Sequence, residues 1–368
     1  MRTVNGEPSF HLGTPELDLH LTARGGHMAP VVFHLAGRDV SPYSLSPWEP
    51  AEYPELPPLL SVLRGDFLCF PFGGQEVGPP HGETANAEWM RLESDGRSLR
   101  CRIDTTDSGA GVVKTLETRE GHHAVYFTHE ISGAEGEFSY GNHPVIDFSN
   151  LAEGEGRVTT SAFHWASVYP GAFSNPAEGE TQVFEKGAVI TDLSAVALAA
   201  GGTLDLTHYP TPVGHEDLVM VAHQPVTDEQ PFAWSAAVLD GYVWFSLKNP
   251  VDFPSTILWI SNGGRTAAPW LGRHRGRMGI EDVCSHFADG VVESRRGLLE
   301  KHGVATTRTF RKDAPVTLRN IHAVAALPDG FGAVGRIVPA GEDAVKLIGT
   351  SGGEIVVPLH WRHVVRPA

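Results

Sequence analysis

The sequence predicts an all-β protein, built as one large antiparallel β-sandwich with a few short helices. Its 368 residues include 41 glycines and 27 prolines. This density of helix-breaking residues limits long helices and favours strands joined by turns. Several segments alternate apolar and polar residues or are rich in β-branched residues, which is typical of antiparallel strands. Two such segments are separated by Asp240-Gly241, a frequent hairpin turn.

The first sixty residues predict paired strands followed by an irregular segment. Residues 18–21 and 29–35 carry the strand pattern and flank a turn at Arg24-Gly25-Gly26-His27. Residues 41–60 contain six prolines in twenty positions. Because proline restricts both itself and the residue before it, we expect an extended crossing segment there rather than a helix or a central strand.

The rest of the chain predicts further strands and two short helices. The strands are expected over residues 99–104, 111–118, 123–131, 232–239, 242–248, 255–260, 316–318, 333–339, 344–348 and 354–359. Apolar residues that begin at Ile280 recur at helical spacing, which predicts a short amphipathic helix over residues 280–292. A second short helix is expected over residues 298–302, ending at Gly303.

No linker divides the chain, and no fixed-period repeat is present. We therefore expect one sandwich domain over residues 1–310 and a strand-rich extension over residues 311–368 that packs on it. Three roles remain open for the extension: covering the sandwich, forming a contact in a homodimer, or closing a site.

The charge and cysteine content exclude several classes of protein. Lysine and arginine number 28 against 44 aspartate and glutamate, a net charge of -16, which disfavours binding to nucleic acid or to anionic membranes. The sequence has no apolar run long enough to span a membrane and no secretory signal at its start. Three widely spaced cysteines fit neither a disulfide framework nor a zinc site, so we expect a reduced, cytoplasmic protein.

Three short stretches carry candidate functional residues. The first, within residues 63–89, ends a strand-like run at Gly73-Gly74 and then presents His81-Gly82-Glu83 from a loop rich in glycine and proline. The second places His143 directly before a proline, at the entrance of a strand. The third, residues 270–282, ends in Gly279-Ile280-Glu281. Each has a plain structural alternative: a tight connection, a turn cap, and an acidic residue at a helix N-terminus.

Taken in order, the three stretches resemble the galactose mutarotase-like superfamily, the aldose 1-epimerases and their relatives. In that family a His-Gly pair follows a proline-containing strand end and is extended in some members to a tryptophan, here Trp89. A later His-Pro corresponds to His143-Pro144, and a Gly-Ile/Leu-Glu stretch corresponds to Gly279-Ile280-Glu281. The resemblance covers roughly residues 15–310 and implies the sandwich fold of that superfamily.

The resemblance also implies roles for the residues. His143 would be the general acid and Glu281 the general base of an isomerase that interconverts the anomers of a sugar, and His81 would help to position that sugar. Asp217, which lies between the two catalytic motifs, would bind sugar hydroxyls. The reaction needs neither a metal nor an organic cofactor, and its partner is a small-molecule carbohydrate. Tryptophan suits stacking on a sugar face, and the candidates are Trp89, Trp165, Trp234 and Trp270.

The sequence departs from the family at two arginine positions. The family's first proline-containing strand is followed by an arginine, whereas this chain continues Gly73-Gly74-Gln75, and Ala85 stands where the extended motif has an arginine. Their loss favours an unphosphorylated sugar. The arginines that could replace them are Arg64, Arg273, Arg275 and Arg277, and of these we assign Arg273 to substrate binding.

Two other functions stay open from the sequence. The missing arginines favour a carbohydrate-binding or sensing protein that does not catalyse the reaction. The His-x-Glu spacing of His81 and Glu83, with a further histidine, would suit a metal-dependent enzyme on a β scaffold.

Overall fold

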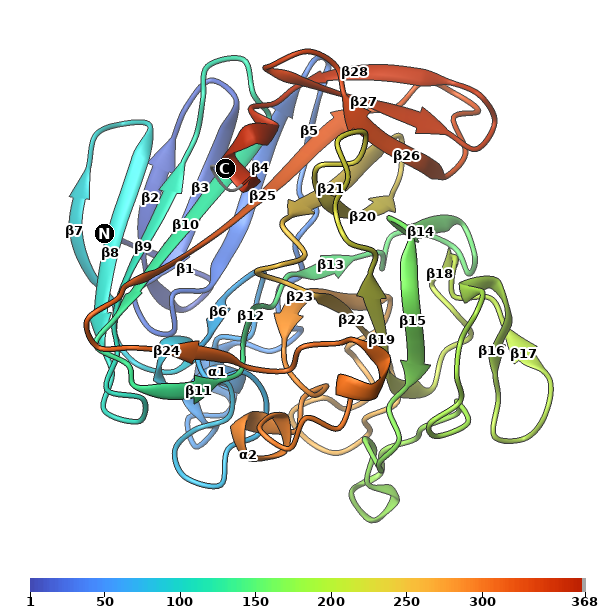
Figure 1. Cartoon of the computed structure of the whole chain (residues 1–368), viewed down its shortest axis with the longest axis horizontal. Coiled ribbons are helices and arrows are strands. Elements are labelled where there is room, and N and C mark those ends of the chain that lie inside the picture. The colour runs from blue at the N-terminus through green and yellow to red at the C-terminus, as the bar shows by residue number, and fades with distance from the viewer. Residues whose placement is uncertain (366–368) are drawn as a thin grey trace.

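A nine-stranded antiparallel sheet forms the largest layer of the molecule (Figure 1), whose computed structural model describes residues 1–365. Its strands run in the order β18-β14-β20-β21-β25-β10-β9-β8-β7. Their bounds are β7 Met90–Ser94, β8 Ser98–Asp104, β9 Gly111–Glu117, β10 Ala124–Ser132, β14 Gly156–Thr160, β18 His208–Tyr209, β20 Ala233–Val238, β21 Tyr242–Lys248 and β25 Val316–Ala326.

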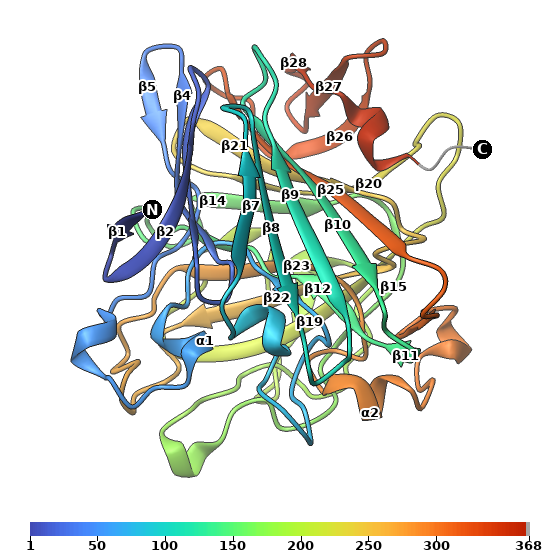
Figure 2. The same cartoon turned by 90° about the vertical axis from the view of Figure 1, so that its left-hand side faces the viewer.

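A seven-stranded antiparallel sheet packs against the nine-stranded one, and its strands run across those of the larger sheet (Figure 2). Its order is β15-β19-β22-β23-β12-β6, and β13 also pairs with β23. Their bounds are β6 Leu68–Cys69, β12 Tyr140–Asn142, β13 Val145–Asp147, β15 Phe163–Val168, β19 His215–His223, β22 Ser255–Asn262 and β23 Arg277–Cys284.

Four smaller sheets complete the fold. A five-stranded N-terminal sheet shares one core with the large sheet, and a three-stranded sheet near the C-terminus forms a third layer. Two further two-stranded pairs lie at the periphery. Their bounds are β1 Arg2–Val4, β2 Glu7–Gly13, β3 Leu17–Thr22, β4 Met28–Leu35, β5 Arg38–Val40, β11 Gly136–Phe138, β24 Arg308–Phe310, β16 Val196–Ala197, β17 Thr203–Leu204, β26 Val334–Pro339, β27 Ala344–Gly349 and β28 Glu354–Pro358.

Helices are few and short, as the glycine and proline content predicts. Within residues 1–365 the α-helices are α1, Pro58–Ser61, and α2, Gly290–Ser294. Single 3-10 turns make up the rest: Pro50–Glu52, Glu83–Ala85, Pro176–Glu178, Leu193–Ala195, Glu300–His302 and Trp361–Val364. None of these helices is long and apolar enough to cross a membrane.

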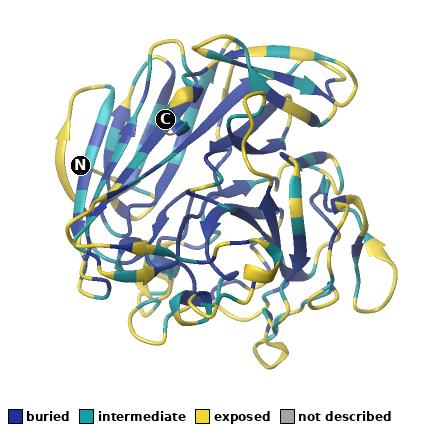
Figure 3. Ribbon diagram, viewed as in Figure 1, coloured by how far each residue is buried: buried dark blue, intermediate teal, exposed yellow. Residues whose placement is uncertain are grey.

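The core lies between the facing sheets, where the strands are buried over most of their length (Figure 3). Four central strands, β19, β21, β22 and β23, have almost no exposed residue. The three cysteines, Cys69, Cys101 and Cys284, are free and buried. Burial raises the pKa of Cys101 to about 11 and that of Cys284 to about 12, so these thiols pack as small apolar groups.

The predicted fold class and most predicted strands are confirmed, but the helix predicted over residues 280–292 is wrong. Residues 277–284 form strand β23, between β22 and β12. Both faces of β23 are buried and each carries a buried carboxyl side chain, Glu281 on one face and Asp282 on the other, so its sequence shows no two-residue alternation. The chain then turns through Phe287, which has a φ of +45°, and becomes helical only at Gly290.

The C-terminal extension differs from its predicted extent. Strand β25 lies between β21 and β10, in the middle of the large sheet. The layer added to the sandwich therefore starts after Ala326, the last residue of β25. Strands β26–β28 and the last 3-10 turn cover the outer face of β20, β21 and β25, where Trp361 packs against Phe232. This part of the extension covers the sandwich, the first of the three roles considered.

Candidate active site

Two of the three sequence motifs meet on neighbouring strands of the seven-stranded sheet. Strand β23 pairs with β12 on one side of residue 143 and with β13 on the other, through Gly141↔Val283 and Val145↔Gly279. His143 lies in the short gap between β12 and β13, so this register sets it beside Glu281 in the middle of β23. Gly279 makes room, because a side chain there would meet the Glu281 carboxylate at 2.3 Å.

His143 and Glu281 form a close pair inside a cavity of about 140 Å³. His143 Nε2 lies 3.3 Å from Glu281 Oε1, and both side chains are nearly inaccessible to solvent. Burial lowers the pKa of His143 well below its ordinary value and raises the pKa of Glu281 well above its own. Burial thus favours the uncharged form of each group, the neutral imidazole and the carboxylic acid.

His81 reaches the same cavity from the loop of the first motif. Its ring lies edge-on to that of His143, with centroids 5.1 Å apart. His81 has a φ of +63°, and its Nδ1 accepts a hydrogen bond from the Gly73 amide at 3.3 Å. Gly82 follows with a φ of +73°, and a side chain there would meet the Phe70 carbonyl oxygen at 2.2 Å. Glycine at position 82 is thus needed for the close approach of this loop to the sheet. Burial lowers the pKa of His81 to about 4.

Aromatic rings and one arginine form the walls of the cavity. Trp259 of β22 presents its edge to His143, and Trp270 packs edge-on against Trp259. The guanidinium of Arg265 lies over the Trp270 ring, 4.7 Å from its centroid, and Nε lies 3.0 Å from Glu180 Oε1. Such a mixture of aromatic surface and a few polar groups is typical of a small-molecule site.

A buried carboxylate supports this wall from behind. Glu216 of β19 accepts hydrogen bonds from Trp259 Nε1 at 3.1 Å and from Ser261 Oγ at 3.0 Å. Its Oε2 lies 4.0 Å from Arg265 Nε, and burial raises its pKa to about 7. Glu216 therefore fixes the Trp259 ring and lies within reach of Arg265.

Known proteins resemble this chain in structure but not detectably in sequence. No protein-family model and no curated protein matches the sequence. A putative aldose 1-epimerase from Escherichia coli K12 superposes with a TM-score of 0.58 at 14% identity, covering 88% of this chain and 100% of its own. An aldose epimerase homologue from C. elegans gives 0.60 at 10% identity, with 88% and 100% covered. A galactose mutarotase related enzyme from Lactobacillus acidophilus gives 0.53 at 9% identity, with 88% and 99% covered.

The chain has the galactose mutarotase-like fold. The fold that the three motifs predicted is thereby confirmed. On this galactose mutarotase-like scaffold, His81, His143, Glu281 and Trp270 share one cavity.

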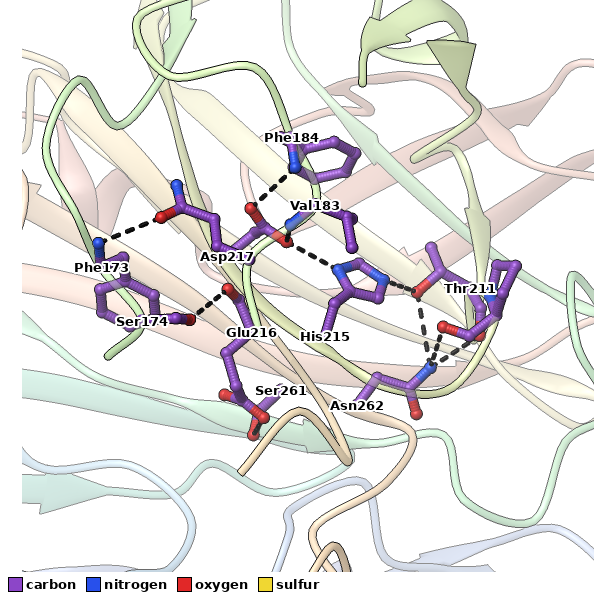
Figure 4. Close-up of polar contacts among 12 residues, drawn as sticks. Phe173, Ser174, Val183, Phe184, Thr211, His215, Glu216, Asp217, Ser261 and Asn262 are labelled. Atoms are coloured by element: carbon purple, nitrogen blue, oxygen red, sulfur yellow. Dashed lines mark hydrogen bonds and ion pairs between the residues drawn. The ribbon is translucent and has the colours of Figure 1, made fainter. Parts of the chain in front are cut away.

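Asp217 does not line that cavity. Figure 4 shows its polar contacts. Its carboxylate accepts hydrogen bonds from the backbone amides of Val183 and Phe184, both at 3.1 Å, and bonds His215 Nδ1 at 2.7 Å. Asp217 thus anchors the loop that contains Val183 and Phe184. Its neighbour Glu216 instead points to the cavity wall. Because β19 is buried on both faces, its sequence does not indicate which of Glu216 and Asp217 faces the cavity.

The other predicted sugar-binding residues also lie outside the cavity lining. Trp89 is buried, donates from Nε1 to the Thr84 carbonyl at 2.8 Å, and so supports the loop of His81. Arg273 is exposed and donates to the Pro269 carbonyl at 3.2 Å. Trp234 packs under the C-terminal layer, and Trp165 stacks on His302 near a separate surface hollow.

The suggested replacements for the missing arginines serve the scaffold instead. Arg64 is buried and bonds the Val4, Asn5 and Val62 carbonyls, Arg275 bonds the Gly272 carbonyl, and Arg277 pairs with Asp147. Sequence reasoning missed Arg265, which lines the cavity, because the chain around it resembles no family motif.

The described part of the chain contains no cluster of side chains that would support the hypothesis of a metal-dependent enzyme. Glu83 turns to Thr106, where its carboxylate accepts hydrogen bonds from the backbone amide and the hydroxyl. Over residues 1–365 no three side chains of histidine, cysteine, aspartate or glutamate lie together as metal ligands would. The His-x-Glu spacing that suggested a metal therefore reflects a loop contact.

Proposed function

We propose that this protein interconverts the α and β anomers of an unphosphorylated aldose, the isomerase activity of an aldose 1-epimerase. The observation that carries the proposal is the His143–Glu281 pair, with 3.3 Å between Nε2 and Oε1, facing a cavity that His81 also lines. The galactose mutarotase-like fold agrees with this function.

The reaction needs two proton transfers at oxygens that share one carbon. The acid gives a proton to the ring oxygen, and the bond from this oxygen to the anomeric carbon breaks. The base takes the proton of the anomeric hydroxyl, so the anomeric carbon becomes an aldehyde. Rotation of the aldehyde and ring closure, with the two roles reversed, give the other anomer. The ring oxygen and the anomeric hydroxyl oxygen are bonded to the same carbon. An acid and a base that lie as close together as His143 and Glu281 can therefore reach both oxygens at once.

We assign His143 as the group that faces the ring oxygen and Glu281 as the group that faces the anomeric hydroxyl. Burial favours the uncharged forms of both groups in the free protein. Sugar hydroxyls that enter the cavity would supply hydrogen bonds to the carboxylate and the imidazolium, which favours the charged forms. The substrate itself would thus prepare the acid and the base.

The charges around the cavity favour a neutral sugar. Within residues 1–365, Arg265 is the single lysine or arginine in the cavity lining, and Glu180 already pairs with it. A phosphate group usually requires a cluster of arginine or lysine side chains. The aromatic surfaces of Trp259 and Trp270 suit the apolar faces of a pyranose instead.

Two substitutions test the assignment on the aldose that reacts fastest. His143→Ala and Glu281→Gln should each lower kcat for mutarotation by about 10²–10⁴, the usual contribution of a placed acid or base. Polarimetry or NMR exchange measures the rate, and circular dichroism confirms that each variant is folded. Full activity in both folded variants would contradict the assignment.

A sugar-binding protein without catalysis is the second candidate. The observation that favours it is the absence of the family's arginines, both in the segment Gly73-Gly74-Gln75 and at Ala85. Calorimetry would then show an aldose binding to the cavity while the wild-type protein leaves its mutarotation rate unchanged.

A further inference from the structure

The turn before β4 packs behind the catalytic pair rather than at the surface. His27, which ends the Gly25-Gly26-His27 turn, is fully buried, and its ring stacks on Phe67 with centroids 4.1 Å apart and planes 15° apart. Phe67 also stacks on His143, at 4.5 Å and 17°. Two imidazoles so close to one phenyl ring cannot share a face of it. The three rings therefore form a stack in the order His27, Phe67, His143.

This stack orients the His143 ring, which no hydrogen bond from the described residues to its second nitrogen does. A catalytic imidazole is commonly oriented by a hydrogen bond on its second nitrogen. His143 Nδ1 is buried, and no side chain or backbone group within residues 1–365 bonds it. The direction of Nε2 toward Glu281 thus depends on the rings that pack against His143.

The same turn holds the loop that carries His81. His27 Nε2 donates a hydrogen bond to the Ala85 carbonyl at 3.0 Å, and the Gly25 amide donates to the Ala87 carbonyl at 2.8 Å. A side chain at Gly25 would meet the Ala85 carbonyl oxygen at 2.5 Å, so only glycine permits this approach. One imidazole therefore contacts both the His143 stack and the His81 loop.

We propose that His27 is a positioning residue for the proposed isomerase reaction, holding Phe67 against His143 through its ring and the His81 loop through its Nε2–H. The role needs a flat ring and a hydrogen-bond donor in one side chain, which histidine provides at this size. The inference rests on the proposed function for its effect on rate, but its geometry concerns His143 whether or not the protein is an enzyme.

The charge state of His27 agrees with this role. Burial, with smaller effects from the nearby Arg64 and Lys114 side chains, lowers the pKa of His27 to about 3. His27 therefore stays neutral while His143 gains and loses a proton. A cation at this position would oppose protonation of His143.

Two substitutions at His27 separate its ring from its donor. His27→Gln keeps a donor and removes the ring, so water should reach His143 and its pKa should rise toward the ordinary value. His27→Phe keeps the ring and removes the donor, so the NMR signals of His81 should shift while the pKa of His143 stays low. Each variant should lower kcat about 10- to 100-fold, with KM within about twofold, because small misplacements of catalytic groups have effects of this size.

His322 provides the matched control. It is fully buried and hydrogen-bonded, to Tyr43 and Asn320, and burial lowers its pKa to about 3, but it does not line the cavity. His322→Gln and His322→Phe should lower the melting temperature about as much as the His27 variants and leave kcat and the His143 and His81 signals unchanged. Equal losses of kcat at both positions would overturn the proposal, and so would His27 variants that match the wild type.

Two further measurements test the role of His27 if its variants do not fold or if the protein does not catalyse mutarotation. If the His27 variants do not fold, nitrogen NMR of the wild type decides: a neutral His27 ring with its proton on Nε2 between about pH 5 and 8 supports the proposal, and titration in that range overturns it. If the wild type does not catalyse mutarotation, the proposed function fails. The His143 and His81 signals of the His27 variants then decide the positioning role alone.

Discussion

Burial shifts the pKa values of His143 and Glu281 in opposite directions, and this sets a pH dependence at the scale of single residues. The form with one proton is the active form, because it contains both an acid and a base. Burial lowers the pKa of His143 below 6.5 and raises that of Glu281 above 4.5. On the acid side, activity is lost when the pair takes up a second proton, so the acid limb lies well below pH 6.5.

We therefore expect kcat/KM for mutarotation to be flat through neutral pH, with its acid midpoint clearly below 6.5, the ordinary histidine value. The check is a pH profile of kcat/KM, which reports the free protein. An acid midpoint at the ordinary histidine value would mean that His143 is hydrated and that the dry pair described above does not exist.

Arg265 and Arg273 give a second prediction at this scale. Arg265 lines the cavity, whereas the sequence-based assignment gave substrate binding to the exposed Arg273. Arg265→Ala should raise KM about 10- to 100-fold, the range for a lost hydrogen bond to a charged group. Steady-state kinetics on both alanine variants separates the two assignments, since a rise in KM in the Arg273 variant alone would support the sequence-based one.

At the scale of elements, β23 joins the active site to a polar layer inside the sandwich. Successive side chains of a strand point to opposite faces, so Glu281 faces the cavity while Asp282 faces the large sheet. Asp282 Oδ1 lies 2.8 Å from Lys248 Nζ of β21, and neither side chain is exposed. Thr256 of β22 and Ser246 also donate hydrogen bonds to this carboxylate. The ion pair thus ties β23 to the opposite sheet.

Lys248→Met should therefore destabilise the protein strongly. It leaves the Asp282 charge buried without its partner, which typically costs about 3–5 kcal/mol. The surface pair of Lys346 and Glu354, at 3.0 Å, is the comparison. Because exposed pairs contribute about 0–1 kcal/mol, Lys346→Met should have little effect. Urea unfolding of both variants measures the difference, and equal losses would show that the buried pair does not stabilise the fold.

Some of the strands could be predicted from the sequence and others could not. Strands that alternate or end in clear turns, such as β8 to β10 and β20 to β22, could be predicted from the chain. Strand β23 could not, because burial on both faces removes the two-residue period. The same burial in β19 hides which of Glu216 and Asp217 faces the cavity. His81, His143 and Glu281 could be identified from short motifs, whereas Arg265, Phe67 and His27 depend on contacts between distant segments.

At the scale of the whole molecule, the many histidines set the stability toward acid. Burial lowers the pKa of seven imidazoles in the core and around the cavity. They are His27, His81, His129, His143, His223, His274 and His322. A histidine whose pKa is lowered by folding binds its proton only after unfolding, so stability is lost as the pH falls below 6.5, the ordinary histidine value.

Three buried carboxyls act in the opposite sense, because burial raises the pKa of Asp66, Glu216 and Glu281. More imidazoles than carboxyls are shifted in this way, so unfolding takes up protons near pH 5.5 and the folded state loses stability as the pH falls. We expect the free energy of unfolding to fall steeply from pH 6.5 to 5. Urea unfolding at a series of pH values measures this slope, and His322→Gln should reduce it by about one proton. A flat profile over this range would contradict the burial of neutral histidines.

The central claim is that the cavity of His81, His143 and Glu281 opens and closes an aldose ring. The most direct measurement is the mutarotation rate of a panel of unphosphorylated aldoses, followed by polarimetry or NMR exchange with the wild-type protein. We expect the protein to accelerate the mutarotation of at least one aldose and to leave that of the corresponding 6-phosphate unchanged. Binding of an aldose in the cavity with no acceleration of any sugar would contradict the claim and favour a carbohydrate-binding protein.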